Sequence, residues 1–227
     1  MVSTSMLLRS TPLGAGPLAR SIRKNHLTYL SYLRLASLRQ AAEEVRRVPG
    51  VVIECGVALG GSGILLASLL RDRPYHGYDT FEEFPPPGPD DPAKAHRHYA
   101  QLASGKAKGL GGNTYHGYLP DLVDRVAQSF TDYGVTANLH KGLFDDSLKP
   151  EWPIALAHID ADWYESVRLC FERITPRLSP GARLVIDDYA DYGGAKKATD
   201  EYLAAHPDVT VLRRSGHLVL GYHPAGI

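Results

Sequence analysis

Residues 51–63 read VVIECGVALGGSG and decide the fold of this 227-residue chain. An apolar run with the length of a buried strand ends near Glu54 and enters a glycine-rich loop, after which apolar residues recur at helical spacing. A strand that enters a helix through such a loop presents backbone N–H groups and the positive end of the helix dipole to a ligand. The stretch therefore predicts a strand, a cofactor-binding loop and a helix with Ser62 as its N-cap.

A second acid points to the kind of cofactor. Asp79 ends the next apolar segment, about 20 to 25 residues beyond the loop, where α/β nucleotide folds place the carboxylate that accepts the ribose hydroxyls. The glycines of the loop match the dinucleotide fingerprint only loosely, so the loop alone is also consistent with an ordinary tight turn. Loop and acid together favour a cofactor that contains adenosine.

Composition limits the class of protein. Basic and acidic residues number 25 each and 44% of residues are hydrophobic, so nothing favours disorder, a nucleic-acid partner or a membrane surface. No apolar run approaches the roughly 18 residues of a membrane-spanning helix. Cys55 and Cys170 are too few for a disulfide framework and fit a reducing compartment. We expect one large α/β domain in the cytoplasm.

Two segments have compositions of their own. No acid precedes Glu43, a bias that organelle transit peptides share. We favour instead an N-terminal arm and cap helix over residues 1–45, with the helix at residues 27–45 serving in packing, in a subunit contact or as a cap over the substrate, followed by the main domain at residues 46–227. Within that domain, residues 80–115 are rich in proline and glycine and predict a lid, since long irregular segments in compact domains are often functional.

Strands and helices alternate through the rest of the chain. Beyond the strand at residues 75–79, strands are expected at 135–141, 155–159 and 182–186, helices at 120–130, 164–178 and 195–205, and a hairpin at 209–213 and 217–222. This alternation predicts a doubly wound, mostly parallel sheet that closes with an antiparallel hairpin. Ligands of such sheets bind at the carboxyl ends of the strands.

Four aspartates follow two neighbouring expected strands: Asp160 and Asp162 after one, Asp187 and Asp188 after the next. Carboxylates this close together raise each other's pKa and cost free energy unless a cation offsets their charge. Carboxylate oxygens suit a hard ion such as Mg²⁺. Capping of the following helix is an equally good account of Asp162, whereas we interpret the other three as metal ligands.

Five segments together resemble one enzyme family, the TylF/MycF (macrocin O-methyltransferase) family. They read ECGVALGGSG, YDTFEEFP, KGLFDDSL, HIDADWYES and LSPGARLVIDDY and occur in the same order over roughly residues 51–202. Members of that family are S-adenosylmethionine-dependent, Mg²⁺-dependent enzymes that methylate sugar hydroxyls of natural products. The resemblance implies a class I SAM-methyltransferase, Rossmann-like fold with a seven-stranded sheet.

The resemblance also implies roles for residues of this chain. Asp160, Asp187 and Asp188 would hold Mg²⁺, and Asp160 would also be the catalytic base. The implied contacts of S-adenosylmethionine are Glu54, Gly56, Val57, Ser62, Asp79, Gly142 and Phe144. The expected acceptor is a glycosylated small molecule of secondary metabolism, such as an antibiotic. The N-terminal helix and the exposed edge of the hairpin offer interfaces, so we expect a homo-oligomer.

Three other functions fit parts of the sequence. The run Asp160-Ala161-Asp162 is also the DxD pattern with which nucleotide-sugar glycosyltransferases hold Mn²⁺ and a sugar diphosphate, but such an enzyme has no use for the glycine loop and Asp79. A hydride-transferring oxidoreductase would use the loop but not the acids at the strand ends. A non-catalytic subunit that kept only the fold is disfavoured because the acids are all retained.

Further polar residues fall near the expected site. His140 and His158 lie on expected strands and are interpreted as core residues rather than bases. Tyr189, Asp191 and Tyr192 follow the metal acids and are candidates for contacts with the acceptor. Tyr29 and Tyr32 are candidates for the edge of the substrate site.

Overall fold

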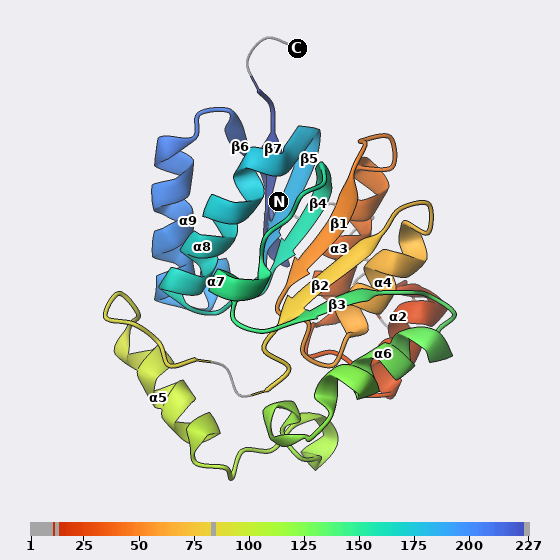
Figure 1. The fold of residues 1–227 in the computed structure, drawn as a ribbon, viewed down its shortest axis with the longest axis vertical. Helices are drawn as coiled ribbons and strands as arrows, with labels where there is room; N and C mark the ends of the chain where they lie inside the picture. Colours follow the sequence, from red (N-terminus) through yellow and green to blue (C-terminus); the bar gives the residue numbers. More distant parts are fainter. Residues whose placement is uncertain (1–10, 12–13, 83–84, 225–227) are drawn as a thin grey trace.

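The computed structural model describes residues 11, 14–82 and 85–224. Its centre is a seven-stranded sheet with the order β3-β2-β1-β4-β5-β7-β6 (Figure 1). The strands are β1 Val51–Cys55, β2 Tyr75–Asp79, β3 Asn138–Lys141, β4 Ile154–Ile159, β5 Leu178–Ile186, β6 Val209–Ser215 and β7 His217–Tyr222. Neighbouring strands pair in parallel except where β7 pairs with β5 and β6. The predicted doubly wound sheet with its antiparallel C-terminal hairpin is confirmed.

Helices cover both faces of this sheet (Figure 1). One layer contains α2 Gly16–Lys24, α3 Tyr32–Glu44, α4 Gly61–Leu69 and α6 Leu122–Asp132, and the other contains α7 Phe144–Ser147, α8 Tyr164–Ile174 and α9 Gly193–Ala205. Each layer packs on its own apolar core. The central strands β1 and β4 are buried along their whole length, which explains why they are apolar except for Glu54 and His158.

The predicted cap helix at residues 27–45 is wrong in its start, because α3 begins only at Tyr32, and the earlier helix α2 ends before residue 27. His26 adopts a left-handed conformation, with φ of 55°, which ends α2. The Ser31 side chain accepts a hydrogen bond from Arg34 N at 3.3 Å and caps α3. The capping bond at Ser31 thus marks the start of α3 at Tyr32, later than the leucine spacing predicts.

The N-terminal arm expected before residue 27 contains a helix, α2. Residues 16–20 form the start of α2, where Pro17 is tolerated because its missing N–H has no partner in a first helical turn. Residues 1–10, 12 and 13 of that prediction lie outside the described part of the chain. In the part that is described, no helix is both long and apolar enough to cross a membrane.

Two further expectations are corrected. The segment at residues 80–115 is not irregular throughout, because it contains the helix α5 Ala93–Ala103 and the short 3₁₀ turn η1 Leu110–Gly112. The helix α4 begins at Gly61, with Gly60 at φ of 87° as its N-cap, so Ser62 lies inside the helix and does not cap it. Glycine suits this cap position because, having no Cβ atom, it adopts a positive φ without steric cost.

Asp91, near the start of the predicted lid segment, forms hydrogen bonds that connect this segment to the first turn of α8. Its side chain is 6% exposed and accepts hydrogen bonds from Tyr164 N and Gly88 N, both at 2.9 Å. The cap of α8, one of two roles left open for Asp162, therefore belongs to Asp91.

We expect Asp91→Ala to lower the free energy of unfolding by about 1–2 kcal/mol, because it removes a buried helix cap. Urea denaturation measures the loss. Asp90→Ala is the matched control, because Asp90 forms an exposed ion pair with Lys197. Such a pair stabilises the folded state by less than about 1 kcal/mol. Equal decreases in the free energy of unfolding in both variants would show that Asp91 stabilises the fold only through its charge and not as a helix cap.

Candidate active site

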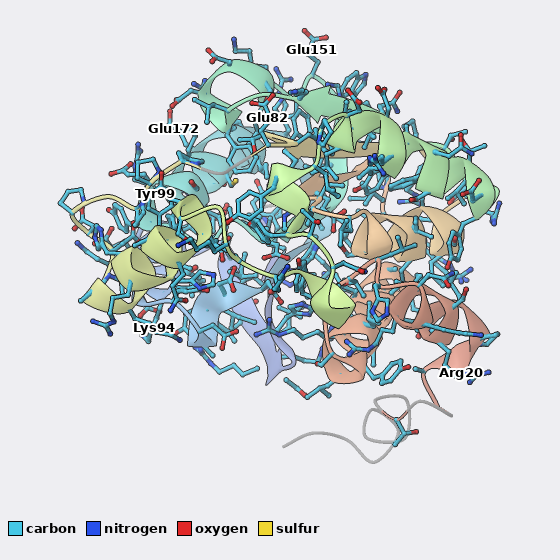
Figure 2. The ribbon with its side chains drawn as sticks, turned by 90° about the horizontal axis from the view of Figure 1, so that it is seen from below. Arg20, Glu82, Lys94, Tyr99, Glu151 and Glu172 are labelled. Carbon is cyan, nitrogen blue, oxygen red and sulfur yellow. The ribbon has the colours of Figure 1, made fainter. Side chains whose placement is uncertain are left out.

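A cavity of about 770 Å³ opens at the carboxyl ends of the parallel strands. It lies where the strand order reverses, between β1 and β4, the position at which such sheets bind ligands. In Figure 1 the segment that follows β2, drawn yellow to green, lies beyond this edge of the sheet. Figure 2 looks onto the edge and shows α5, with Lys94 and Tyr99, at its side. Lys94 lines the cavity, as does Tyr29 from the N-terminal part.

The glycine loop and Asp79 form one end of the cavity. Asp79 Oδ2 accepts hydrogen bonds from Val57 N at 2.7 Å and Ala58 N at 2.9 Å, and its Oδ1 accepts one from Phe81 N at 2.8 Å. Gly56 has φ of 90°, and a Cβ atom there would lie 1.9 Å from the carbonyl oxygen of Asp160. The loop therefore packs directly on the end of β4, and only glycine fits at this position.

The residues predicted to bind the cofactor divide into two groups. Gly56, Asp79, Gly142 and Phe144 line the cavity. Glu54, Val57 and Ser62 are buried beneath it and do not appear among its lining residues. For these three the structure supports a role in packing and in holding the loop rather than a side-chain contact with the cofactor.

Glu54 has partners of its own. Its side chain is 0% exposed, accepts a hydrogen bond from Tyr75 Oη and lies 2.7 Å from Nδ1 of His158. His158 is thus a core residue, as expected. His140 is half-buried and stacks on Tyr78, with ring centroids 4.4 Å apart, which also fits a packing role.

The three predicted metal ligands meet at the other end of the cavity. Asp160, Asp187 and Asp188 offer oxygen atoms that all lie within 4.8 Å of one another. Burial, together with the neighbouring carboxylates, raises the pKa of Asp160 and of Asp188 well above the ordinary value. Asp188 Oδ2 is buried with no hydrogen-bond partner among the described residues. Carboxylate oxygens crowded and unsatisfied in this way fit a hard divalent cation.

Asp187 differs from its neighbours because it has two cationic or polar partners. Arg34 Nη1 lies 2.8 Å from Asp187 Oδ2, and His217 Nε2 lies 2.7 Å from Oδ1. Burial alone would raise the pKa of Asp187, but the contacts with His217 and Arg34 outweigh it and lower the pKa. Arg34 also bonds Asp191, so α3 contributes a guanidinium group to the site.

Asp162 lies between the two ends of the cavity. Burial and the charge of Asp187 raise its pKa to about 7, which is the range that suits a general base near neutral pH. Of the residues proposed for the acceptor, Tyr29, Asp191 and Tyr192 line the cavity, whereas Tyr32 and Tyr189 do not.

Several lining residues were not found from the sequence. Arg34 is one of six basic residues that precede Glu43, and nothing in the local sequence distinguishes it from the others. Tyr115 and His116 lie on the lid side of the cavity, and His116 Nδ1 lies 3.1 Å from Tyr29 Oη. This contact links His116, which directly follows the predicted lid segment, to Tyr29 in the N-terminal part of the chain.

The sheet order, the glycine loop after β1 and the acid after β2 define a class I methyltransferase fold. Among solved structures, the O-methyltransferase NovP is similar, with a TM-score of 0.68 and 25% identity over 87% of this chain and 81% of that one. The model of the macrocin-O-methyltransferase (TylF) family matches residues 23–212, and the chain belongs to that family. The resemblance noted from the sequence is confirmed.

Curated relatives carry the names of natural-product methyltransferases. The chain is 32% identical over 183 residues to the 8-demethyl-8-(2,3-dimethoxy-alpha-L-rhamnosyl)-tetracenomycin-C 4'-O-methyltransferase of Streptomyces olivaceus, a match that covers 72% of this chain and 62% of the relative. It is 30% identical over 198 residues to the demethyldecarbamoylnovobiocin O-methyltransferase of Streptomyces niveus, covering 79% of this chain and 69% of the relative. The matched region thus spans less than two thirds of the first of these relatives.

Proposed function

We propose that this protein transfers the methyl group of S-adenosylmethionine to a hydroxyl group of a glycosylated natural product, with Mg²⁺ held by Asp160, Asp187 and Asp188. The observation that carries the proposal is the single cavity that joins the Asp79 end to the acid cluster. Membership of the macrocin-O-methyltransferase family and the relatives named for tetracenomycin and novobiocin support the reaction and the acceptor class.

Asp79 would bind the ribose of the cofactor. The weakest of its donors is Thr80 Oγ1, which lies 3.3 Å from Asp79 Oδ1, so a ribose hydroxyl would take its place. Gly142, with φ of 138°, lines the same end of the cavity and presents backbone rather than a side chain. S-adenosylmethionine held there would supply the methyl group to an acceptor in the same cavity.

The acid cluster would serve the acceptor. Bound Mg²⁺ would supply a positive charge that stabilises the acceptor oxygen as it loses its proton. Asp160 or Asp162 would take that proton, and Arg34, whose Nη1 lies 2.8 Å from Asp187 Oδ2, would hold Asp187 in position. Alignment of the acceptor oxygen with the methyl group accounts for about 7–11 kcal/mol of the barrier in well-oriented reactions, and a cavity closed by the lid segment would provide it.

The geometry disfavours the glycosyltransferase alternative. The group of donor atoms that includes Asp160 contains Asp187 and Asp188 and not Asp162, the second aspartate of the DxD run. Cys55 and Cys170 are both free thiols, which is consistent with the reducing cytoplasm that we propose as the location.

The test is isothermal titration of S-adenosylhomocysteine into the protein, with Mg²⁺ and with EDTA, followed by methyl-transfer assays on glycosylated acceptors. We expect similar micromolar binding under both conditions, and turnover only with Mg²⁺. Asp79→Ala should weaken binding by about tenfold or more, since it removes charge-assisted hydrogen bonds worth about 1.5–3 kcal/mol. Asp72→Ala, at a side chain 68% exposed, should leave binding unchanged. Absence of binding in the unaltered protein would overturn the proposal.

A further inference from the structure

Two buried histidines lie behind the acid cluster. His158 on β4 is 0% exposed and His217 at the start of β7 is 3% exposed. Their rings meet edge to face, with centroids 5.4 Å apart. The antiparallel register pairs Leu218 with Ile186, which brings His217 beside Asp187. Neither histidine lines the cavity, so neither is placed to contact the acceptor.

The histidines belong to a buried polar chain that crosses the sheet. Tyr75 on β2 donates to Glu54 on β1, and Glu54 Oε1 lies 2.7 Å from His158 Nδ1 on β4. His158 packs against His217 on β7, whose Nε2 lies 2.7 Å from Asp187 Oδ1. Burying polar groups costs free energy, and a chain of them that ends on an acid of the site calls for a functional account.

We propose that His217 is a positioning residue that holds the Asp187 carboxylate in the orientation needed to bind a divalent cation, with His158 and Glu54 as its support. The inference rests on the proposed function, in which Asp187 is a metal ligand. A carboxylate has about four lone-pair positions. His217 lies at one oxygen and Arg34 at the other, so the group cannot rotate freely and its remaining lone pairs keep a fixed direction.

His217 and Asp187 are in close contact, but their geometry does not meet the criteria of a hydrogen bond. Asp187 Oδ1 and both ring nitrogens of His217 have no aligned hydrogen-bond partner within the described chain, although the distance of 2.7 Å between Oδ1 and Nε2 is that of a hydrogen bond. Partners of this kind, next to a metal ligand, commonly set the orientation of the ligand.

A second metal ion is the competing account. Donor atoms of His158, Asp187 and His217 also lie within 4.8 Å of one another. A tetrahedral ion with bonds of about 2.1 Å would, however, hold its donor atoms about 3.4 Å apart. His217 Nε2 and Asp187 Oδ1 are closer than that, at 2.7 Å. The geometry therefore favours an orienting contact.

The experiment measures Mn²⁺ affinity by electron paramagnetic resonance, with Mn²⁺ in place of Mg²⁺. We expect His217→Leu to weaken Mn²⁺ binding by about 10- to 100-fold without changing the affinity for S-adenosylhomocysteine. His217→Gln, whose amide nitrogen can stand where Nε2 stood, should recover most of the affinity. His140→Leu is the control, because it removes a histidine from β3, four strands away from β5.

Asp187→Ala separates the possible failures. If it loses Mn²⁺ while His217→Leu binds Mn²⁺ normally, the inference about His217 fails and the proposed function stands. If it binds Mn²⁺ as well as the unaltered protein, the proposed metal site fails and the inference with it. A folded His217→Gln variant that stays as weak as His217→Leu also overturns the inference, as does stoichiometric zinc in the purified protein, since the histidines would then be ligands.

Discussion

Asp160→Asn is expected to lower methyl-transfer turnover by about 10²–10⁴-fold, the contribution of a general base, and at the same time to raise the melting temperature of the metal-free protein. The two effects have one origin. Burial and the charges of Asp187 and Asp188 raise the pKa of Asp160 well above its ordinary value. Without a cation, the ionised Asp160 carboxylate therefore raises the free energy of the folded state. Asparagine has the same shape as aspartate but carries no charge, so it avoids this cost.

The sign of the stability effect follows from linkage. A carboxyl group with a raised pKa in the folded state destabilises the protein above that pKa and has no effect below its unfolded pKa of about 3.9. The difference in stability between Asp160→Asn and the unaltered protein should accordingly be largest at high pH and vanish in acid. Each 1 kcal/mol corresponds to about 2–4 °C in melting temperature for a chain of this size.

Thermal denaturation in EDTA and a turnover assay in Mg²⁺ measure the two effects on the same preparations. Asp146→Asn is the matched control, because it removes one charge from an exposed position on α7 outside the cavity. We expect it to change neither quantity appreciably. An Asp160→Asn protein that turns over normally would contradict the role of Asp160 in the proposed chemistry.

Gly56→Ala is expected to abolish measurable binding of S-adenosylhomocysteine and to destabilise the protein by at least about 3 kcal/mol. The backbone of Gly56 has φ of 90°, and the added Cβ would lie 1.9 Å from the carbonyl oxygen of Asp160. That oxygen belongs to backbone that cannot easily retreat, since Asp160 N donates to Cys55 O at 2.9 Å. The glycine loop must therefore move, and the cofactor end of the cavity moves with it.

Gly134→Ala separates the clash from the cost of the backbone conformation. Gly134 has φ of 66°, and a Cβ atom there would meet nothing within 4 Å. The Gly134→Ala substitution should lower the free energy of unfolding by only about 1–2 kcal/mol, the cost of a left-handed backbone for a residue other than glycine. It should leave ligand binding intact. Urea denaturation and calorimetric titration compare the two variants. Similar losses in both would mean that the close approach of Gly56 to β4 has no special consequence.

The sequence predicted the sheet because strands and helices alternate along the chain and because the central strands β1 and β4 are buried at every position and therefore mostly apolar. It predicted the meeting of Asp160 with Asp187 and Asp188 because parallel strands end at the same edge. Helix ends were less predictable. Ser31 caps the predicted helix at a later start than the leucine spacing indicates, and Gly60 takes the cap position expected for Ser62.

The sequence by itself thus determined the fold class, the glycine loop with Asp79 and the three-carboxylate cluster, because each of these depends on periodicity or on residues at or next to a strand end, and it determined the family through the resemblance of five segments. Only the tertiary structure brought Arg34 to Asp187, 153 positions along the chain, and assigned Glu54 to His158 rather than to the cavity. It also placed His217 beside Asp187. Contacts of this kind depend on how separate elements pack, and no local pattern of residue types encodes them.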